Sequence, residues 1–182
     1  MFEGMPQAPI RFISMDTPHV HRMALWLSSL AEAYKPGDAR RSYYHAIKQR
    51  LSVQFSKHAL VLPDTSAPFW KTTNYLDGVN GVYRWHYATT SGSGYGPYEG
   101  SGAMTLGWWS FLHTTPVRDL YRSLAEAFPL KANAIATYVG PNTSRKRNPL
   151  VTEPACYTNG FRELLSRLAY QQTFQLAQDK IN

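Results

Sequence analysis

The sequence predicts a mainly α-helical domain of stacked antiparallel helix hairpins, with one long aromatic loop that contains a short β-hairpin. Two observations lead to this prediction. Apolar residues recur at three- and four-residue spacing in several stretches that begin with capping residues. Between two of these stretches, residues 62–101 lose that period and are dominated by glycine, proline, serine, threonine and aromatic residues.

The first two expected helices form a hairpin. Residues 1–15 are an irregular N-terminal segment, and Asp16-Thr17-Pro18 is then typical of a helix start. Apolar positions continue at helical spacing until Lys35-Pro36-Gly37 ends the pattern. Asp38 can cap a second helix, whose apolar stripe runs to Phe55 and whose basic residues lie largely on the other side.

The long loop collects the unusual residues of the chain. Asn80-Gly81 predicts a tight turn, and residues 82–87 alternate aromatic and cationic side chains, so we expect a short β-hairpin there. The stretch 91–102 is too rich in glycine to be regular. The apolar run Ala103–Leu112 predicts a buried helix because it has no polar face.

Further helical stretches complete the expected fold. Thr115-Pro116 repeats the start with proline in the first turn, and the apolar period continues to Phe128. Residues 132–139 form a shorter element, and Asn159 is expected to cap a last helix with apolar positions Phe161, Leu164, Leu165 and Leu168. Nothing resembles a low-complexity linker, so residues 1–182 are expected to form a single domain.

Composition narrows the class of protein and of partner. With 12 Tyr, 8 Phe and 5 Trp, the chain has more rings than a small core normally uses, so some are expected to line a groove. A net charge of +7 favours anionic partners such as nucleic acid, a membrane surface or an acidic polysaccharide. The single Cys156 excludes an intramolecular disulfide and a cysteine-based zinc site.

Targeting signals are not expected. The chain has no apolar run of membrane-spanning length, and its N-terminus lacks the pattern of a secretory signal. The sequence therefore predicts a soluble protein without a membrane partner, with the cytoplasm as the default compartment. No phosphate loop, dinucleotide fingerprint or metalloprotease motif is present, so no cofactor is predicted.

The first turn of the first helix gathers Asp16, His19, His21 and Arg22. Free backbone N–H groups and the positive end of the helix dipole favour an anion there, such as a substrate carboxylate. The alternative is that Asp16 only caps the helix and the histidines are surface residues. His19 and His21 point about 200° apart on a helix, which argues against a metal pair.

Two further acids stand in the loops. Asp77 lies among turn residues, and Glu99 is bracketed by glycine and two tyrosines just before the expected buried helix. With Asp16 they are candidates for glycoside hydrolysis, which needs one carboxyl group to protonate the leaving oxygen and a second as base or nucleophile. The alternatives are structural: Asp77 bonds to nearby backbone, and Glu99 favours a helix N-terminus.

Aromatic and cationic side chains of the loop suit an acidic sugar. Trp and Tyr rings stack on sugar faces, while Arg and His bind carboxylates or phosphates. Elimination from a uronic-acid polymer needs a Tyr or His to remove the C5 proton and a cation to neutralise the carboxylate. The alternative is the inner face of a packed hairpin. The candidates are His21, Arg22, Tyr83, Arg84, Trp85, His86 and Tyr95.

Three motifs, DTPHVHR at 16–22, NYLDGVNGVYRWHY at 74–87 and YEGSGAM at 98–104, carry a resemblance to a known family. They resemble the (α/α) toroid shared by glycoside hydrolases, polysaccharide lyases and related epimerases, and the last is similar to an E-x-S-G-x-A-M segment of unsaturated-uronide hydrolases. The resemblance implies rings of helix hairpins whose loops hold aromatic and acidic residues around the sugar. Because the chain supplies fewer hairpins than a complete toroid, it is expected to be either the C-terminal part of a larger toroid or a small domain with shared local patterns.

The sequence therefore predicts a carbohydrate-active protein that acts on or binds an anionic, uronic-acid-containing polysaccharide or oligosaccharide. As an enzyme it would be a glycoside hydrolase or a polysaccharide lyase, with Glu99 and Asp77 as acid and base and with His21 and Arg22 orienting the sugar. The alternatives are a non-catalytic nucleic-acid-binding module that uses the basic loop 144–148, and a structural helical module.

Overall fold

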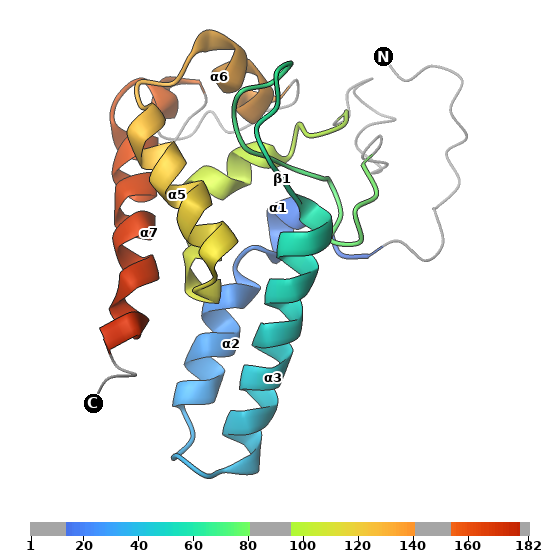
Figure 1. The fold of residues 1–182 in the computed structure, drawn as a ribbon, viewed down its shortest axis with the longest axis vertical. Helices are drawn as coiled ribbons and strands as arrows, with labels where there is room; N and C mark the ends of the chain where they lie inside the picture. The colour runs from blue at the N-terminus through green and yellow to red at the C-terminus, as the bar shows by residue number, and fades with distance from the viewer. Residues whose placement is uncertain (1–13, 81–95, 141–153, 179–182) are drawn as a thin grey trace.

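The computed structural model describes residues 14–80, 96–140 and 154–178, with side chains as far as Phe174, and this part of the chain is mainly helical (Figure 1). Its α-helices are α1 (Thr17–Val20), α2 (Met23–Glu32), α3 (Ala39–Gln54), α5 (Thr115–Ala127), α6 (Ala132–Val139) and α7 (Phe161–Gln178). Short helices of other types are the π-helix η1 (Phe55–Ala59) and the 3-10 helices η2 (Ser101–Leu106), η3 (Trp108–Leu112) and η4 (Ala155–Tyr157).

A small antiparallel sheet joins β1 (Leu60–Val61) to β2 (Lys71–Thr72), with Leu60 opposite Thr72. These strands lie at the start of the segment that the sequence presents as a long loop. The β-hairpin expected at residues 82–87 lies outside the described residues.

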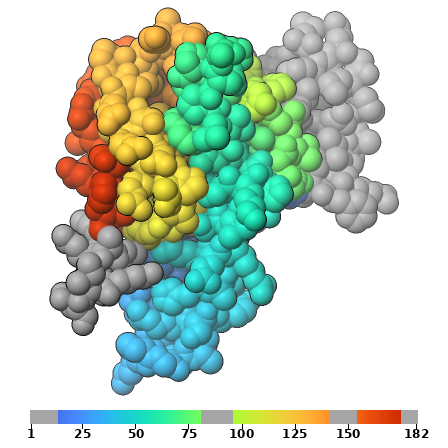
Figure 2. Space-filling view, in the orientation of Figure 1, coloured from blue at the N-terminus to red at the C-terminus, as the bar shows by residue number. Residues whose placement is uncertain are grey.

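The first hairpin consists of α2 and α3, and its outer end projects from the rest of the molecule (Figure 2). Asp38 caps α3 as expected, because its carboxylate accepts a hydrogen bond from Arg40 N at 2.8 Å. The single helix expected from Asp16 to Lys35 is instead interrupted at His21 and Arg22. Since α1 is held by the backbone of residues 74–76 while α2 packs on α3, the interruption joins two differently anchored helices.

The apolar run after Gly102 is buried as expected, but it is not an α-helix. It forms η2 and η3, separated by Gly107, whose backbone has a φ of 88°. A Cβ atom at Gly107 would lie 3.1 Å from the Cβ of Ala169 in α7, so the chain breaks where α7 comes close. Trp109 is fully buried and stacks on Phe55, with 4.0 Å between ring centroids.

Helices α5 and α7 lie side by side and cover η2 and η3 (Figure 1). The apolar period of α5 is confirmed, since Val117, Leu120, Tyr121 and Leu124 are all buried. The hydroxyl of Tyr121 donates to the carbonyl of Met104 at 3.1 Å, and burial raises the pKa of this tyrosine. The α6 helix forms at residues 132–139, as the sequence predicts.

The last helix is confirmed, but its buried face differs from the leucine pattern. Asn159 Oδ1 accepts from Phe161 N at 3.0 Å, which is the expected cap. Leu164 and Leu168 are 55% and 50% exposed. The face that packs inward carries smaller or polar side chains because η3 approaches closely at Gly107, and it consists of Arg162, Ser166, Ala169 and Thr173.

Cys156 is a buried free thiol, and it accepts a hydrogen bond from Arg162 Nε at 3.3 Å. Within the described ranges, every helix falls short of the length or the apolar character that a membrane crossing requires.

Candidate functional site

Three segments that are distant in the sequence meet beside α1, and we call this region the loop junction: residues 14–18, 72–80 and 96–101. The first two run antiparallel. Thr17 N donates to Asn74 O at 2.9 Å, and Leu76 N donates to Met15 O at 3.1 Å. An isolated β-bridge pairs Asp16 with Tyr75, so the start of α1 is fixed by the main chain of the second segment.

The third segment is attached to both of the others. Asn74 Nδ2 donates to Gly96 O at 3.0 Å, and Tyr98 N donates to Asn80 Oδ1 at 2.9 Å. A Cβ atom at Gly100 would lie only 2.6 Å from Cγ of Pro18, the second residue of α1. Glycine at position 100 is therefore what permits this segment to lie directly against the helix start.

The three candidate acids all belong to the loop junction, one in each segment. Asp16 accepts from His19 N at 2.9 Å and also contacts the His19 ring, whose side chain is 72% exposed. Asp77 accepts from Ser14 N at 3.2 Å and from Val79 N at 3.1 Å. Glu99 accepts from Gly96 N. Each carboxylate is thus oriented by at least one main-chain N–H group, which is also what the structural alternatives for these acids require.

The cations expected in the first helix turn differ in exposure. His21 is buried, with 3% of its surface exposed, and so its ring is not positioned to meet a polymer at the surface. Arg22 is exposed, as is His19. Tyr83, Arg84, Trp85, His86 and Tyr95 lie outside the described residues, as does the basic loop 144–148.

Sequence reasoning missed a cation next to the loop junction, Lys71, which directly precedes its second segment. Lys71 is 7% exposed, and its Nζ atom lies 3.1 Å from Asp64 Oδ2 and 4.8 Å from the centre of the Tyr98 ring. Hydrogen bonds from Ser66, Ala67 and Lys71 hold the pKa of Asp64 below its usual value. The available signal was the position of Lys71 in an otherwise uncharged, strand-like stretch, WKTTNY, where a lysine needs a partner.

Tyr98 has an uncommon backbone conformation, with a φ of 66°. This conformation occurs where the segment turns between Asn80 and α1, and it accompanies the contact of the Tyr98 ring with Lys71. Backbone outliers of this kind concentrate at functional sites.

Two hydroxyl groups of the loop junction are buried without a hydrogen-bond partner among the described residues. They are Oγ1 of Thr17 and Oγ1 of Thr72, each in a residue that is 1% exposed. Because buried hydroxyls normally have partners, the junction has more polar groups than the described chain satisfies.

The described part of the chain contains no grouping of three histidine, cysteine or acidic side chains that could hold a metal ion. The loop junction brings together carboxylates and tyrosines, which can act as a general acid or base and can hydrogen-bond a polar ligand. No protein-family model matches the chain, and no curated protein or solved structure matches it at a level that indicates common ancestry.

Proposed function

We propose that the protein is carbohydrate-active and that the loop junction binds, and acts on, an anionic polysaccharide or oligosaccharide that contains uronic acid. One observation carries the proposal. Asp16, Asp77 and Glu99 come from three distant segments of the sequence, and a β-bridge and hydrogen bonds that involve side chains bring these segments together. A set of oriented carboxyl groups is what the hydrolysis of a glycosidic bond needs.

Charge supports an acidic rather than a neutral sugar. The chain carries a net charge of +7, and exposed His19 and Arg22 stand at the start of the first two helices, next to the junction. Lys71 adds a further cation beside Tyr98. In the proposal these groups attract the polymer, while Tyr83, Trp85 and Tyr95 supply the stacking surface.

The proposal includes a toroid-like arrangement of the helices. Its support is that α2 with α3, and α5 with α7, are antiparallel neighbours, as the hairpins of an (α/α) toroid are (Figure 1). The loop junction lies at the end of the α2–α3 hairpin that is opposite its projecting tip. Substrate loops of such folds likewise gather at one end of the hairpins.

Glu99 and Asp77 are the proposed acid and base. In hydrolysis, one protonates the leaving oxygen while the other assists water or attacks the sugar. In elimination, a base removes the proton from C5, the C4–O bond breaks, and a double bond forms in the uronic acid. A nearby cation then stabilises the charge that develops on the carboxylate.

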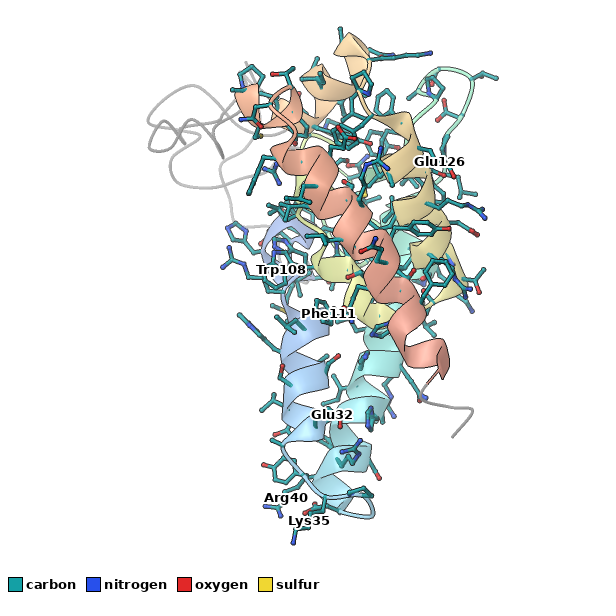
Figure 3. The ribbon with its side chains drawn as sticks, turned by 90° about the vertical axis from the view of Figure 1, so that its left-hand side faces the viewer. Glu32, Lys35, Arg40, Trp108, Phe111 and Glu126 are labelled. Carbon is teal, nitrogen blue, oxygen red and sulfur yellow. The ribbon has the colours of Figure 1, made fainter. Side chains whose placement is uncertain are left out.

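The test is a set of product assays on a panel of uronic-acid polymers, with reducing ends and unsaturated products measured separately. Glu99→Gln and Asp77→Asn each keep an oxygen acceptor for the main chain and should lower turnover by about 100-fold or more. Glu126→Gln is the matched control, because Glu126 is exposed on α5 and does not belong to the loop junction (Figure 3). The proposal would be wrong if the unaltered protein formed no product from any polymer of the panel and was retained on none of them.

One observation favours nucleic-acid binding as the second candidate. The α3 helix contains Arg40, Arg41, Lys48 and Arg50 and no acidic residue, and Arg40 and Arg50 are exposed. Binding through such a surface loses affinity steeply as salt rises, because bound counterions are released. Trp85→Ala should abolish retention on the polysaccharide and leave DNA retention unchanged if the first candidate is correct.

A further inference from the structure

A lysine, a serine and a histidine meet where α2, α3 and the end of η3 come together, and we call Ser28, Lys48 and His113 the Lys48 cluster. Lys48 Nζ, from α3, donates to Ser28 Oγ of α2 at 2.8 Å. The Ser28 hydroxyl in turn donates to Ala24 O at 2.9 Å. The cluster joins the α2–α3 hairpin to the end of η3, and none of its residues belongs to the loop junction.

Lys48 is half-buried and has no ion pair within the described part of the chain. The nearest source of negative charge is Glu32, but both carboxylate oxygens of Glu32 accept from Arg41 Nη2 at 2.8 Å. Lysine is rarely buried without a carboxylate partner, because the ammonium group loses solvation that a hydroxyl alone does not replace. Burial therefore lowers the pKa of Lys48, and the charge of Glu32 opposes this only in part.

His113, the third member of the cluster, has a special backbone conformation and interacts electrostatically with Lys48. It follows η3 with a φ of 55°, in the left-handed region that non-glycine residues rarely adopt. Its Nδ1 atom is buried without a hydrogen-bond partner among the described residues. Burial, together with the charge of Lys48, lowers the pKa of His113 to about 4, so the imidazole is uncharged at neutral pH.

We propose that Lys48 is a nucleophilic amine that condenses with a carbonyl compound, an aldehyde or a ketone, at the Lys48 cluster. A lysine set in low-polarity surroundings beside a second basic group is a recurrent way to activate an amine for imine formation. The inference does not depend on the function proposed for the loop junction, since none of the cluster residues lies there.

The reaction balances without an oxidant or a reductant. The nitrogen lone pair of Lys48 attacks the carbonyl carbon, and a C–N bond forms while the carbonyl π bond opens to a hydroxyl group. The hydroxyl then leaves as water after gaining a proton, and C=N replaces C=O. Ser28 Oγ, 2.8 Å from the nitrogen, is placed to pass a proton from nitrogen to the departing oxygen.

The experiment measures how fast each lysine of the folded, full-length protein reacts with propionaldehyde and cyanoborohydride, which traps the imine as a stable amine. Peptide mass spectrometry resolves the sites. Lys35 and Lys57 are exposed internal references, and Lys71 is a buried reference that is paired with Asp64. At pH 7, Lys48 should react about tenfold faster than Lys35 and Lys57, since a larger fraction of its amine is unprotonated.

The pH profile and two variants test the role of the cluster. The titratable and charged groups around the amine are Glu32, which pairs with Arg41 and His45, and His113, which is uncharged at neutral pH. The reactivity of Lys48 should rise at a lower pH than that of Lys35. Ser28→Ala, and His113→Asn, which keeps a residue tolerant of left-handed backbone, should each slow Lys48 severalfold and leave Lys35 unchanged.

Two results would overturn the inference. One is that Lys48 in the unaltered protein reacts no faster than Lys35 and Lys57 at any pH. The other is that Lys48 keeps its full rate in both variants, which would mean that its neighbours do not assist. The first result needs no substitution, so it remains decisive even where a variant fails to fold.

Discussion

The loop junction and the Lys48 cluster both hold ionisable side chains, and they hold them in opposite ways. In the junction, Asp16, Asp77 and Glu99 each accept a main-chain N–H group, so that every acid has a local donor. In the Lys48 cluster, the amine meets a hydroxyl and an uncharged histidine, while the neighbouring carboxylate is already bound to Arg41. The acids of the first region therefore have hydrogen-bond donors, whereas the amine of the second region has no carboxylate partner among the described residues.

Because of this difference, the two regions suit different chemistry. Carboxylates held by main-chain donors are fixed in direction and suit the binding or protonation of a ligand that arrives from outside. An amine without a counterion is ready to react as a nucleophile. Both regions depend on the same central segment, because η2 begins with Ser101 of the junction and η3 ends beside His113.

Gly102→Ala should break both regions at once and is expected to have the largest effect. A Cβ atom at this position would lie 2.1 Å from the carbonyl oxygen of Tyr138, which belongs to α6 and is backbone that cannot move aside easily. We expect the free energy of unfolding to fall by more than about 3 kcal/mol, measured by urea denaturation. Gly160→Ala is the control, since its φ of 86° brings strain of about 1–2 kcal/mol but no contact within 4 Å. Equal losses in the two variants would contradict the close packing of η2 on α6.

Asp77→Ala should loosen the loop junction and leave the Lys48 cluster intact. The substitution removes the acceptor for Ser14 N and Val79 N, and we expect a loss of about 1–3 kcal/mol in thermal or urea unfolding. Asp119→Ala is a matched control, because Asp119 pairs only with Arg122 on the surface of α5, and the change should stay below about 1 kcal/mol. If both variants lost the same stability, the role of Asp77 in joining two segments would be wrong.

His113 makes the stability of the hairpin region depend on pH. Its pKa is lowered from 6.5 to about 4 in the folded protein, so between these values the unfolded chain binds more protons than the folded one. The contribution of the uncharged His113 to the free energy of unfolding is therefore fully present above pH 6.5, and it is lost as the pH drops toward 4. Unfolding curves of His113→Asn should lack much of this fall, whereas Asp77→Asn should retain it. An unchanged pH profile in His113→Asn would show that the imidazole is not held uncharged.

Leu164→Glu provides a baseline outside both regions and should have the smallest effect. Leu164 is 55% exposed on the outer face of α7, so the free energy of unfolding should change by less than about 0.5 kcal/mol. Ala169→Glu, five residues further along α7 and 4% exposed, should prevent stable folding because it would bury a charge against Gly107. A large loss in Leu164→Glu would mean that the leucine stripe packs inward after all.

The sequence predicts helix positions well where capping residues and period agree. Asp38, the Thr115-Pro116 start and Asn159 each stand at or within two residues of an observed helix start. These signals are local: a cap needs only its own first turn. The apolar composition of Ala103–Leu112 likewise indicates burial correctly, because burial depends on what a side chain is and not on the helix type.

What the sequence could not show depends on contacts between distant segments. The interruption after Val20 reflects the attachment of α1 to Asn74, and the break at Gly107 reflects the approach of α7. The convergence of the three acids has the same origin, since it needs the pairing of residues 14–17 with 74–77. No spacing along the chain encodes that Ser28 and Lys48 meet, because they belong to different helices.

The π-helical turn η1, at the end of α3, shows how a regular helix is connected to a sheet. This turn holds more residues than an α-helical turn does, and thereby rotates the chain that leaves it. The carbonyl of Ala59 is turned to accept from Thr73 N at 2.9 Å, and pairing of β1 with β2 begins at the next residue. Removing one residue from η1 would turn the carbonyl of Ala59 away from Thr73 N. The hydrogen bond that joins residues 72–80 to the end of α3 would then be lost.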